Sequence, residues 1–107
     1  MLLPAPIVMP IESPITNQCL AGNLLPIRIL PFSGRGANSL SLFINENEKK
    51  YEFPNRDVKT STYVALTKEE LQAAGNGECI IRYHVEASLA EPMRRESELT
   101  KLILNLT

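Results

Sequence analysis

The sequence predicts an all-β fold: a two-sheet antiparallel β-sandwich of about seven strands, with one short helical turn before the penultimate strand. Three observations support this prediction. Apolar and polar residues alternate in two long segments near the end of the chain, Gly77–Glu86 and Leu99–Leu106. Turn-forming residues separate short alternating segments through the first half of the chain. At Thr67 the alternation gives way to a helical signature, which stops at Gly75.

Five strands are expected before that helix, from alternation or from β-branched composition. In chain order they are Ile7–Met9, Leu24–Phe32, Ser39–Asn45, Lys49–Phe53 and Thr60–Leu66. Residues 1–6 form a proline-rich lead-in. The first strand is expected at a sheet edge, because the neighbouring prolines cannot donate to a hydrogen-bond ladder.

Loops and turns are expected between these strands. The segment Thr16–Asn23 is polar, Ser33–Asn38 contains two glycines, and Asn45–Glu48 has the composition of a hairpin turn. In the strand that follows Thr16–Asn23, alternation places Leu25, Ile27 and Ile29 in the core and Arg28 outside.

The helical turn has its own start and stop signals. Thr67 precedes Glu70 by three residues, which is the spacing of a capping box. The apolar Leu71 and two alanines follow, and Gly75 provides a C-terminal stop.

Alternation assigns the last two strands an inward and an outward row. The inward row is Cys79, Ile81, Tyr83, Val85, Leu102, Leu104 and Leu106. The outward row is Arg82, His84, Glu86 and Lys101. Tyr83 is expected to anchor the core, with its hydroxyl hydrogen-bonded to a partner. Between the two strands, Glu91–Glu98 mixes both charges and is expected to be a solvated loop.

Composition excludes several classes of protein. A chain of 107 residues forms one domain, spanning 1–107. The net charge is −1 with both signs scattered, so no nucleic-acid partner is expected. No apolar run approaches the roughly 20 residues that span a bilayer. The N-terminal segment lacks basic residues and is interrupted by prolines, so any export signal is expected elsewhere in a longer parent protein.

The order of these segments resembles a known family. A Leu-Pro-Ala-Pro lead-in, a glycine-containing turn, a leucine-rich strand and a threonine-rich strand come first. A Thr-Lys-Glu-Glu-Leu helix, a Gly-x-x-x-Ile-x-Tyr-x-Val strand and a Ser-x-x-Thr-x-Leu-x-Leu end follow. From Leu3 to Leu106 the chain is similar to the bacterial immunoglobulin-like repeats found in tandem in large pseudomonad surface or secreted proteins.

The resemblance implies an immunoglobulin-like sandwich and a non-catalytic role. The module would be a structural spacer or an adhesion module of a larger exported protein, located at the cell surface or outside the cell, with neighbouring repeats as partners. The alternative is a module that binds a protein partner or a carbohydrate through loops at one end of the sandwich. The candidate binding residues in those loops are Arg35, Asn38, Arg56, Lys59, Arg94 and Arg95.

The residues that could carry chemistry are few, and no enzyme is expected. His84 is the only histidine, and alternation places it on the opposite face from Cys79, so the two cannot form a nucleophile–base pair. No cofactor and no metal site is assigned, although Glu46, Asn47, Glu48 and Asp57 carry oxygen ligands of the kind that calcium takes.

Cys19 and Cys79 are the only cysteines, and two interpretations of them stay open. A disulfide between them would stabilise the fold by about 4 kcal/mol in the chain-entropy model. The favoured interpretation is two independent thiols, one in a loop and one buried on a strand.

Overall fold

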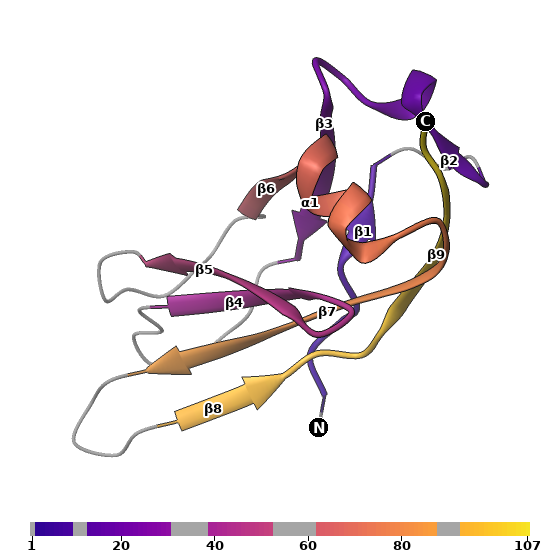
Figure 1. Cartoon of the computed structure of the whole chain (residues 1–107). Helices are drawn as coiled ribbons and strands as arrows, with labels where there is room; N and C mark the ends of the chain where they lie inside the picture. Colours follow the sequence, from indigo (N-terminus) through magenta and orange to yellow (C-terminus); the bar gives the residue numbers. More distant parts are fainter. Residues whose placement is uncertain (1, 10–12, 31–38, 53–61, 88–92) are drawn as a thin grey trace.

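A computed structural model gives the fold of the chain and describes residues 2–9, 13–30, 39–52, 62–87 and 93–107 (Figure 1). Within these residues the chain is mostly β, with strands in two sheets and a single small α-helix. The strands are β1 (Ile7–Val8), β2 (Ile15–Thr16), β3 (Leu24–Ile29), β4 (Ser39–Ile44), β5 (Asn47–Glu52), β6 (Thr62–Thr67), β7 (Gly77–Ala87), β8 (Met93–Glu96) and β9 (Thr100–Asn105). A 3-10 helix, η1 (Asn17–Cys19), follows β2, and the α-helix α1 (Lys68–Ala74) follows β6.

The smaller sheet has the strand order β1-β3-β6 in the described part of the chain, and its pairings are antiparallel. The short strand β1 lies at its edge, as its prolines predicted. In β3 the side chains of Leu25, Ile27 and Ile29 are fully buried, which confirms the alternation read from the sequence.

The larger sheet has the order β2-β9-β7-β4-β5, and β8 also pairs with β7. The first part of β7 pairs with β9 and its last part with β8, both antiparallel. The expectation of a solvated loop over Glu91–Glu98 is therefore wrong for Met93–Glu96. Charged side chains at this position are compatible with a strand, because only one face of an antiparallel sheet needs to be apolar.

One pairing departs from the expected antiparallel arrangement. Strand β2 runs parallel to β9, with Ile15 opposite Leu104 and Thr16 opposite Asn105. The predicted polar loop from Thr16 thus begins within a strand and continues as η1. A two-residue strand has too little sequence to show a period of two, so alternation could not reveal it.

Helix α1 has the ends that the sequence predicted. The backbone N–H of Glu70 donates to Thr67 Oγ1 at 3.1 Å, and the Thr67 N–H donates to Glu70 Oε1 at 2.9 Å. These reciprocal bonds confirm the capping box. Gly75, at the C-terminal end, has a φ of 85°, which side chains disfavour.

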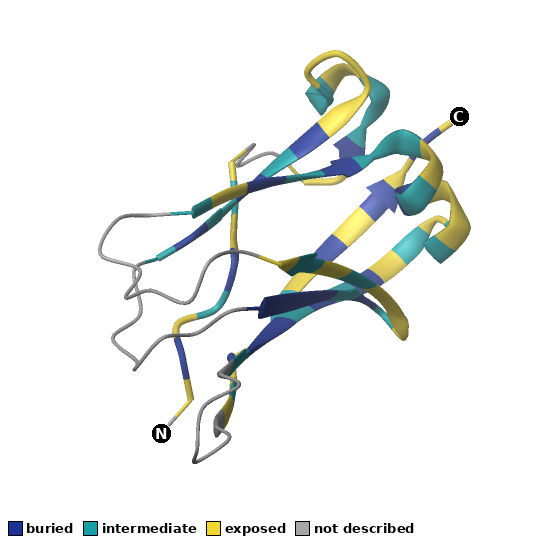
Figure 2. Ribbon diagram, turned by 90° about the vertical axis from the view of Figure 1, so that its left-hand side faces the viewer, coloured by how far each residue is buried: buried dark blue, intermediate teal, exposed yellow. Residues whose placement is uncertain are grey.

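The core lies between the sheets, and both contribute alternate residues to it (Figure 2). The predicted inward row of β7 and β9 is buried throughout. Tyr83 is fully buried, and its hydroxyl donates to the Pro4 carbonyl at 2.8 Å. The predicted hydroxyl partner is thus a backbone group of the N-terminal segment.

The body of the molecule is elongated, measuring 46 × 23 × 22 Å. The two ends of the chain lie at opposite ends of this body (Figures 1 and 2). Helix α1 lies toward the end of the body that holds the C-terminus, and the hairpin β7–β8 extends toward the opposite end (Figure 1).

Candidate functional site

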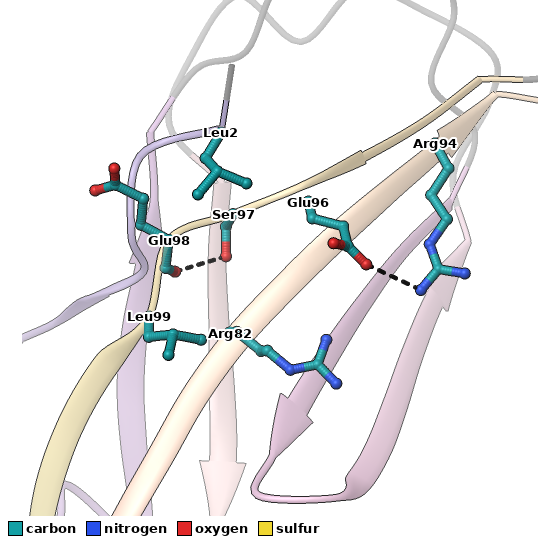
Figure 3. A pocket seen from close by; sticks show the side chains of 7 residues that line it. All are labelled: Leu2, Arg82, Arg94, Glu96, Ser97, Glu98 and Leu99. Atoms are coloured by element: carbon teal, nitrogen blue, oxygen red, sulfur yellow. Dashed lines mark hydrogen bonds and ion pairs between the residues drawn. The ribbon is translucent and has the colours of Figure 1, made fainter.

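A shallow groove of about 590 Å³ lies beside the junction of β8 and β9 (Figure 3). It combines side chains from the N-terminal segment, from β7 and β8, and from the junction itself. The described residues that line it are Leu2, Arg82, Arg94, Glu96, Ser97, Glu98 and Leu99.

The junction is held in place by hydrogen bonds around Ser97. Its Oγ accepts from the Tyr83 N–H at 2.9 Å and donates to the Glu98 carbonyl at 2.8 Å. On the other side, the Leu3 N–H donates to the Glu96 carbonyl, and the Glu98 N–H donates to the Leu3 carbonyl, each at 2.9 Å. The N-terminal segment therefore forms one wall of the groove as a short parallel bridge.

The apolar part of the groove is exposed. Leu2 is 54% exposed and Leu99 is 58% exposed. Figure 3 shows both side chains beside the Ser97 junction. Single exposed leucines are common on protein surfaces, but two at one groove provide a contact site for an apolar side chain.

The charged part of the groove is internally paired. Arg94 Nη2 lies 3.3 Å from Glu96 Oε1, and both side chains are more than half exposed. The guanidinium carbon of Arg82 lies 4.1 Å from the centre of the Phe43 ring, within the range of a cation–π contact. With the two cations Arg82 and Arg94 and the carboxylates of Glu96 and Glu98 in its lining, the formal charges of the groove balance.

His84 is buried, contrary to the prediction that it lies on the surface row. Only 5% of the residue is exposed, although it faces away from the core. The Phe43 ring lies 5.3 Å away between centroids, and the small Ser41 lies directly across on β4. Because β7 is flanked by strands on both sides at this point, neighbouring side chains cover its outer face. Alternation indicates which face a residue occupies, and it does not indicate how that face is covered.

The neighbours of His84 affect its protonation. Burial lowers its pKa, as does the nearby positive charge of Arg94, while the carboxylates of Glu86, Glu48 and Glu96 act in the opposite direction. The net effect is a pKa below the ordinary value of a histidine. Nε2 lies 3.2 Å from Glu86 Oε1, and Nδ1 has no hydrogen-bond partner among the described residues.

Of the predicted binding residues, only two fall in the described part of the chain. Arg94 and Arg95 lie on β8 rather than in a loop. Their side chains diverge, because successive strand residues face opposite ways. Arg94 lines the groove, and Arg95, paired with Val85, lies on the core-facing side. The other predicted residues, Arg35, Asn38, Arg56 and Lys59, lie outside the described residues.

The two cysteines, both in the described part of the chain, are not bonded to each other. Cys79 is buried in β7, and burial raises the pKa of its thiol. Cys19 lies in η1, where its sulfur lies 3.6 Å from Thr16 Oγ1.

Metal and membrane signals are also absent from the described residues. No group of three or more His, Cys, Asp or Glu side chains there is placed to hold a metal ion. Asp57, one of the oxygen ligands considered for calcium, lies outside them. No helix in the described ranges combines the length and apolar character needed to cross a membrane.

Of the described residues that line the groove, only Arg94 was a predicted site residue. The others did not stand out: Leu2, Arg82, Glu96, Ser97, Glu98 and Leu99. One signal was present. In the last strand the inward residues have even numbers, so Leu99 and Ile103 are apolar residues in the outward phase. The parallel bridge that brings Leu2 to the groove has no sequence signature.

Comparisons of the chain with protein-family models, with curated proteins and with solved structures gave no match.

Proposed function

We propose that this chain is an immunoglobulin-like module with a non-catalytic role, acting as a spacer or adhesion domain within a larger bacterial surface-associated or secreted protein. The elongated body, with the chain entering and leaving at opposite ends of a 46 Å axis, is the observation that carries the proposal. Modules with this arrangement extend a protein when they are joined in series.

The strand order supports the immunoglobulin-like part of the proposal. When β1, β3, β4, β6, β7 and β9 are lettered A, B, C, E, F and G, the sheets read A-B-E and G-F-C. Immunoglobulin domains divide these strands between their two sheets in the same way. In this assignment β5 corresponds to an added C′ strand, and α1 lies in the E–F connection.

The described side chains support the non-catalytic part of the proposal. His84 faces away from the core, whereas the thiol of Cys79 lies within it. The groove contains Ser97, but its hydroxyl is bonded to the backbone of Tyr83 and Glu98 and has no imidazole beside it to act as a base.

Joining two and three copies of the module in series tests the spacer role. Small-angle X-ray scattering should show the maximum dimension growing by about 46 Å per copy, the length of one body. A maximum dimension that stays near that of a folded-back pair would contradict the proposal. Further copies of the same block in the flanking reading frame would support it independently.

The second candidate function is binding of a protein partner at the groove. The specific observation is the pair of exposed leucines, Leu2 and Leu99, beside balanced charges. None of the described lining residues is aromatic, and this favours an apolar side chain of a protein over a sugar ring, which usually stacks on an aromatic residue.

An array screen against proteins and glycans tests this candidate, and Leu99→Ser gives the sharpest comparison. Ile103→Ser is the matched control, because Ile103 is another exposed, outward-phase residue of the same segment and does not line the groove. A partner that binds at the groove should be lost with the first variant and kept with the second. Equal loss with both variants would exclude the groove.

A further inference from the structure

His84 lies in the larger sheet where the pairing of β7 with β8 ends. It pairs with Glu96 at the end of the β7–β8 ladder, immediately before the Ser97 junction where the groove begins. Its ring is buried against Phe43 on one side and is flanked by charged residues of three strands. We propose that neutral His84 acts as an acid-sensitive latch, which holds hairpin β7–β8 closed and loosens β8 when the ring gains a proton.

The neutral ring fits its surroundings in one tautomer. Nε2 is 3.2 Å from Glu86 Oε1, and this proximity to a carboxylate favours the tautomer that carries its proton on Nε2. Nδ1 then carries a lone pair, and no described residue donates to it. An unsatisfied acceptor in a buried ring lowers the stability of the folded state only modestly.

The protonated ring does not fit in the same way. A second N–H appears on Nδ1, and no described residue accepts its hydrogen bond. A buried charged donor without a partner is costly, so the ring must find an acceptor or leave its site. Departure of the ring, or a turn toward an acceptor on β8, changes the contacts between β7 and β8.

Charged groups face the ring from three strands, β7, β8 and β5, whereas the outward residues of β4 beside it are Ser39, Ser41 and Phe43. On β7 the outward charges are Arg82 and Glu86, and on β8 they are Arg94 and Glu96. On β5 they are Glu48, Lys50 and Glu52, which pair with Phe43, Ser41 and Ser39 of β4. The carboxylates stabilise the protonated form of the His84 ring, and the cations destabilise it.

Glu96 is the acceptor best placed by register, because it lies directly across from His84. In the neutral state it is paired with Arg94 at 3.3 Å. If Glu96 turns to the protonated ring, Arg94 loses that partner. Both residues line the groove, so the shape and charge of the groove change with them.

The test is an NMR titration of the intact chain. With a single histidine, the imidazole carbon and nitrogen signals belong to His84 without further assignment. We expect the Nε2–H tautomer at neutral pH and a midpoint below 6.5. The backbone amides of residues 94–97 should shift with the same midpoint. The open fraction measured by their hydrogen exchange should rise by up to about tenfold for each pH unit by which the closed-state midpoint lies below 6.5.

Three variants make the test specific. His84→Gln removes the titrating group and should abolish the shift of residues 94–97. Glu86→Gln keeps an acceptor for Nε2 and removes its charge, so both midpoints should fall together. Glu78→Gln lies on the same strand but is paired with Lys101, and it should change neither of the two midpoints.

The proposal is wrong if His84 titrates at or above 6.5, or if the amide signals of residues 94–97 do not shift while His84 titrates. It is also wrong if the Glu86→Gln variant separates the two midpoints, a result that does not depend on the folding of His84→Gln.

Discussion

Lys49 Nζ lies 2.8 Å from Glu70 Oε1 and so joins edge strand β5 to the first turn of helix α1. The same ammonium donates to the Ala65 carbonyl on β6 at 3.1 Å. Lys49 thus reaches from the larger sheet to the smaller one. An inward-pointing charge on an edge strand also discourages pairing with another chain.

Replacing Glu70 should destabilise the fold more than replacing Lys49. Glu70→Ala removes the ion pair and leaves the part-buried Thr67 N–H without its acceptor, and an unsatisfied donor costs about 1–3 kcal/mol. Lys49→Met removes the ion pair, the bond to Ala65 and a cation–π contact with the Tyr51 ring, and it leaves the capping box intact. Chemical denaturation of both variants measures the difference, with Glu70→Gln as the control that keeps an acceptor for the Thr67 N–H. Equal effects of the two replacements would contradict a dual role for Glu70.

Acid should weaken the same contact. Burial opposes ionisation of Glu70, but its hydrogen bonds from Lys49 and Thr67 outweigh this and lower its pKa below 4.5. A carboxyl with a lowered pKa in the folded state stabilises the fold above its unfolded pKa, and this stabilisation is lost as the pH falls through the folded pKa. Denaturation midpoints measured from pH 6 to pH 3 should therefore fall less steeply in Glu70→Gln than in the unmodified chain.

Tyr83 should ionise late. Burial raises its pKa to about 12, although the positive charge of Arg95 acts in the opposite direction. Absorbance at alkaline pH should show a late tyrosine phase with a midpoint near a pKa of about 12. Since the folded pKa is raised, the associated stability is complete below the ordinary value of about 10 and is lost above it. Tyr83→Phe should remove the late phase. It should also free the N-terminal segment, because Pro4 loses its hydrogen-bond donor.

Two asparagine side chains hold the end of the chain. The amide of Asn76 donates to the Leu106 carbonyl at 2.9 Å and accepts from its N–H at 2.8 Å. Asn17 makes the corresponding contacts with Thr107 at 3.2 Å and 3.4 Å.

Asn76→Ala should lower the free energy of unfolding by about 1–2 kcal/mol, because it removes two hydrogen bonds. Asn17→Ala should cost less, since its site is exposed. Hydrogen exchange at Leu106 provides a local check, and unchanged protection in Asn76→Ala would be inconsistent with this role.

The two cysteines should behave as separate thiols. Cys79 is buried and its thiol pKa is raised by burial, so it should react with a thiol reagent only when the fold opens. Cys19 is partly exposed and should react first. Labelling followed by mass spectrometry gives the order, and an unreduced mass lower by two protons would establish a disulfide instead.

The sequence predicted those features that depend on local pattern. The capping box from Thr67 to Glu70 and the buried rows of β3, β7 and β9 depend on spacing along one segment, which alternation and helix-start rules capture. The same rules failed where contacts are non-local. The burial of His84 depends on Phe43 and on strands at either side, and the groove depends on Leu3 pairing with Ser97. The pairing of β2 with β9 joins residues far apart in the chain.

That last pairing has a mechanical consequence. Two backbone pairings between the beginning and the end of the chain, Leu3 with Ser97 and β2 with β9, are parallel. A tension applied at the two ends would pull the members of each pair in opposite directions along the strand axis. Their hydrogen bonds would then carry the load in shear and break together, rather than opening one after another as in a zipper.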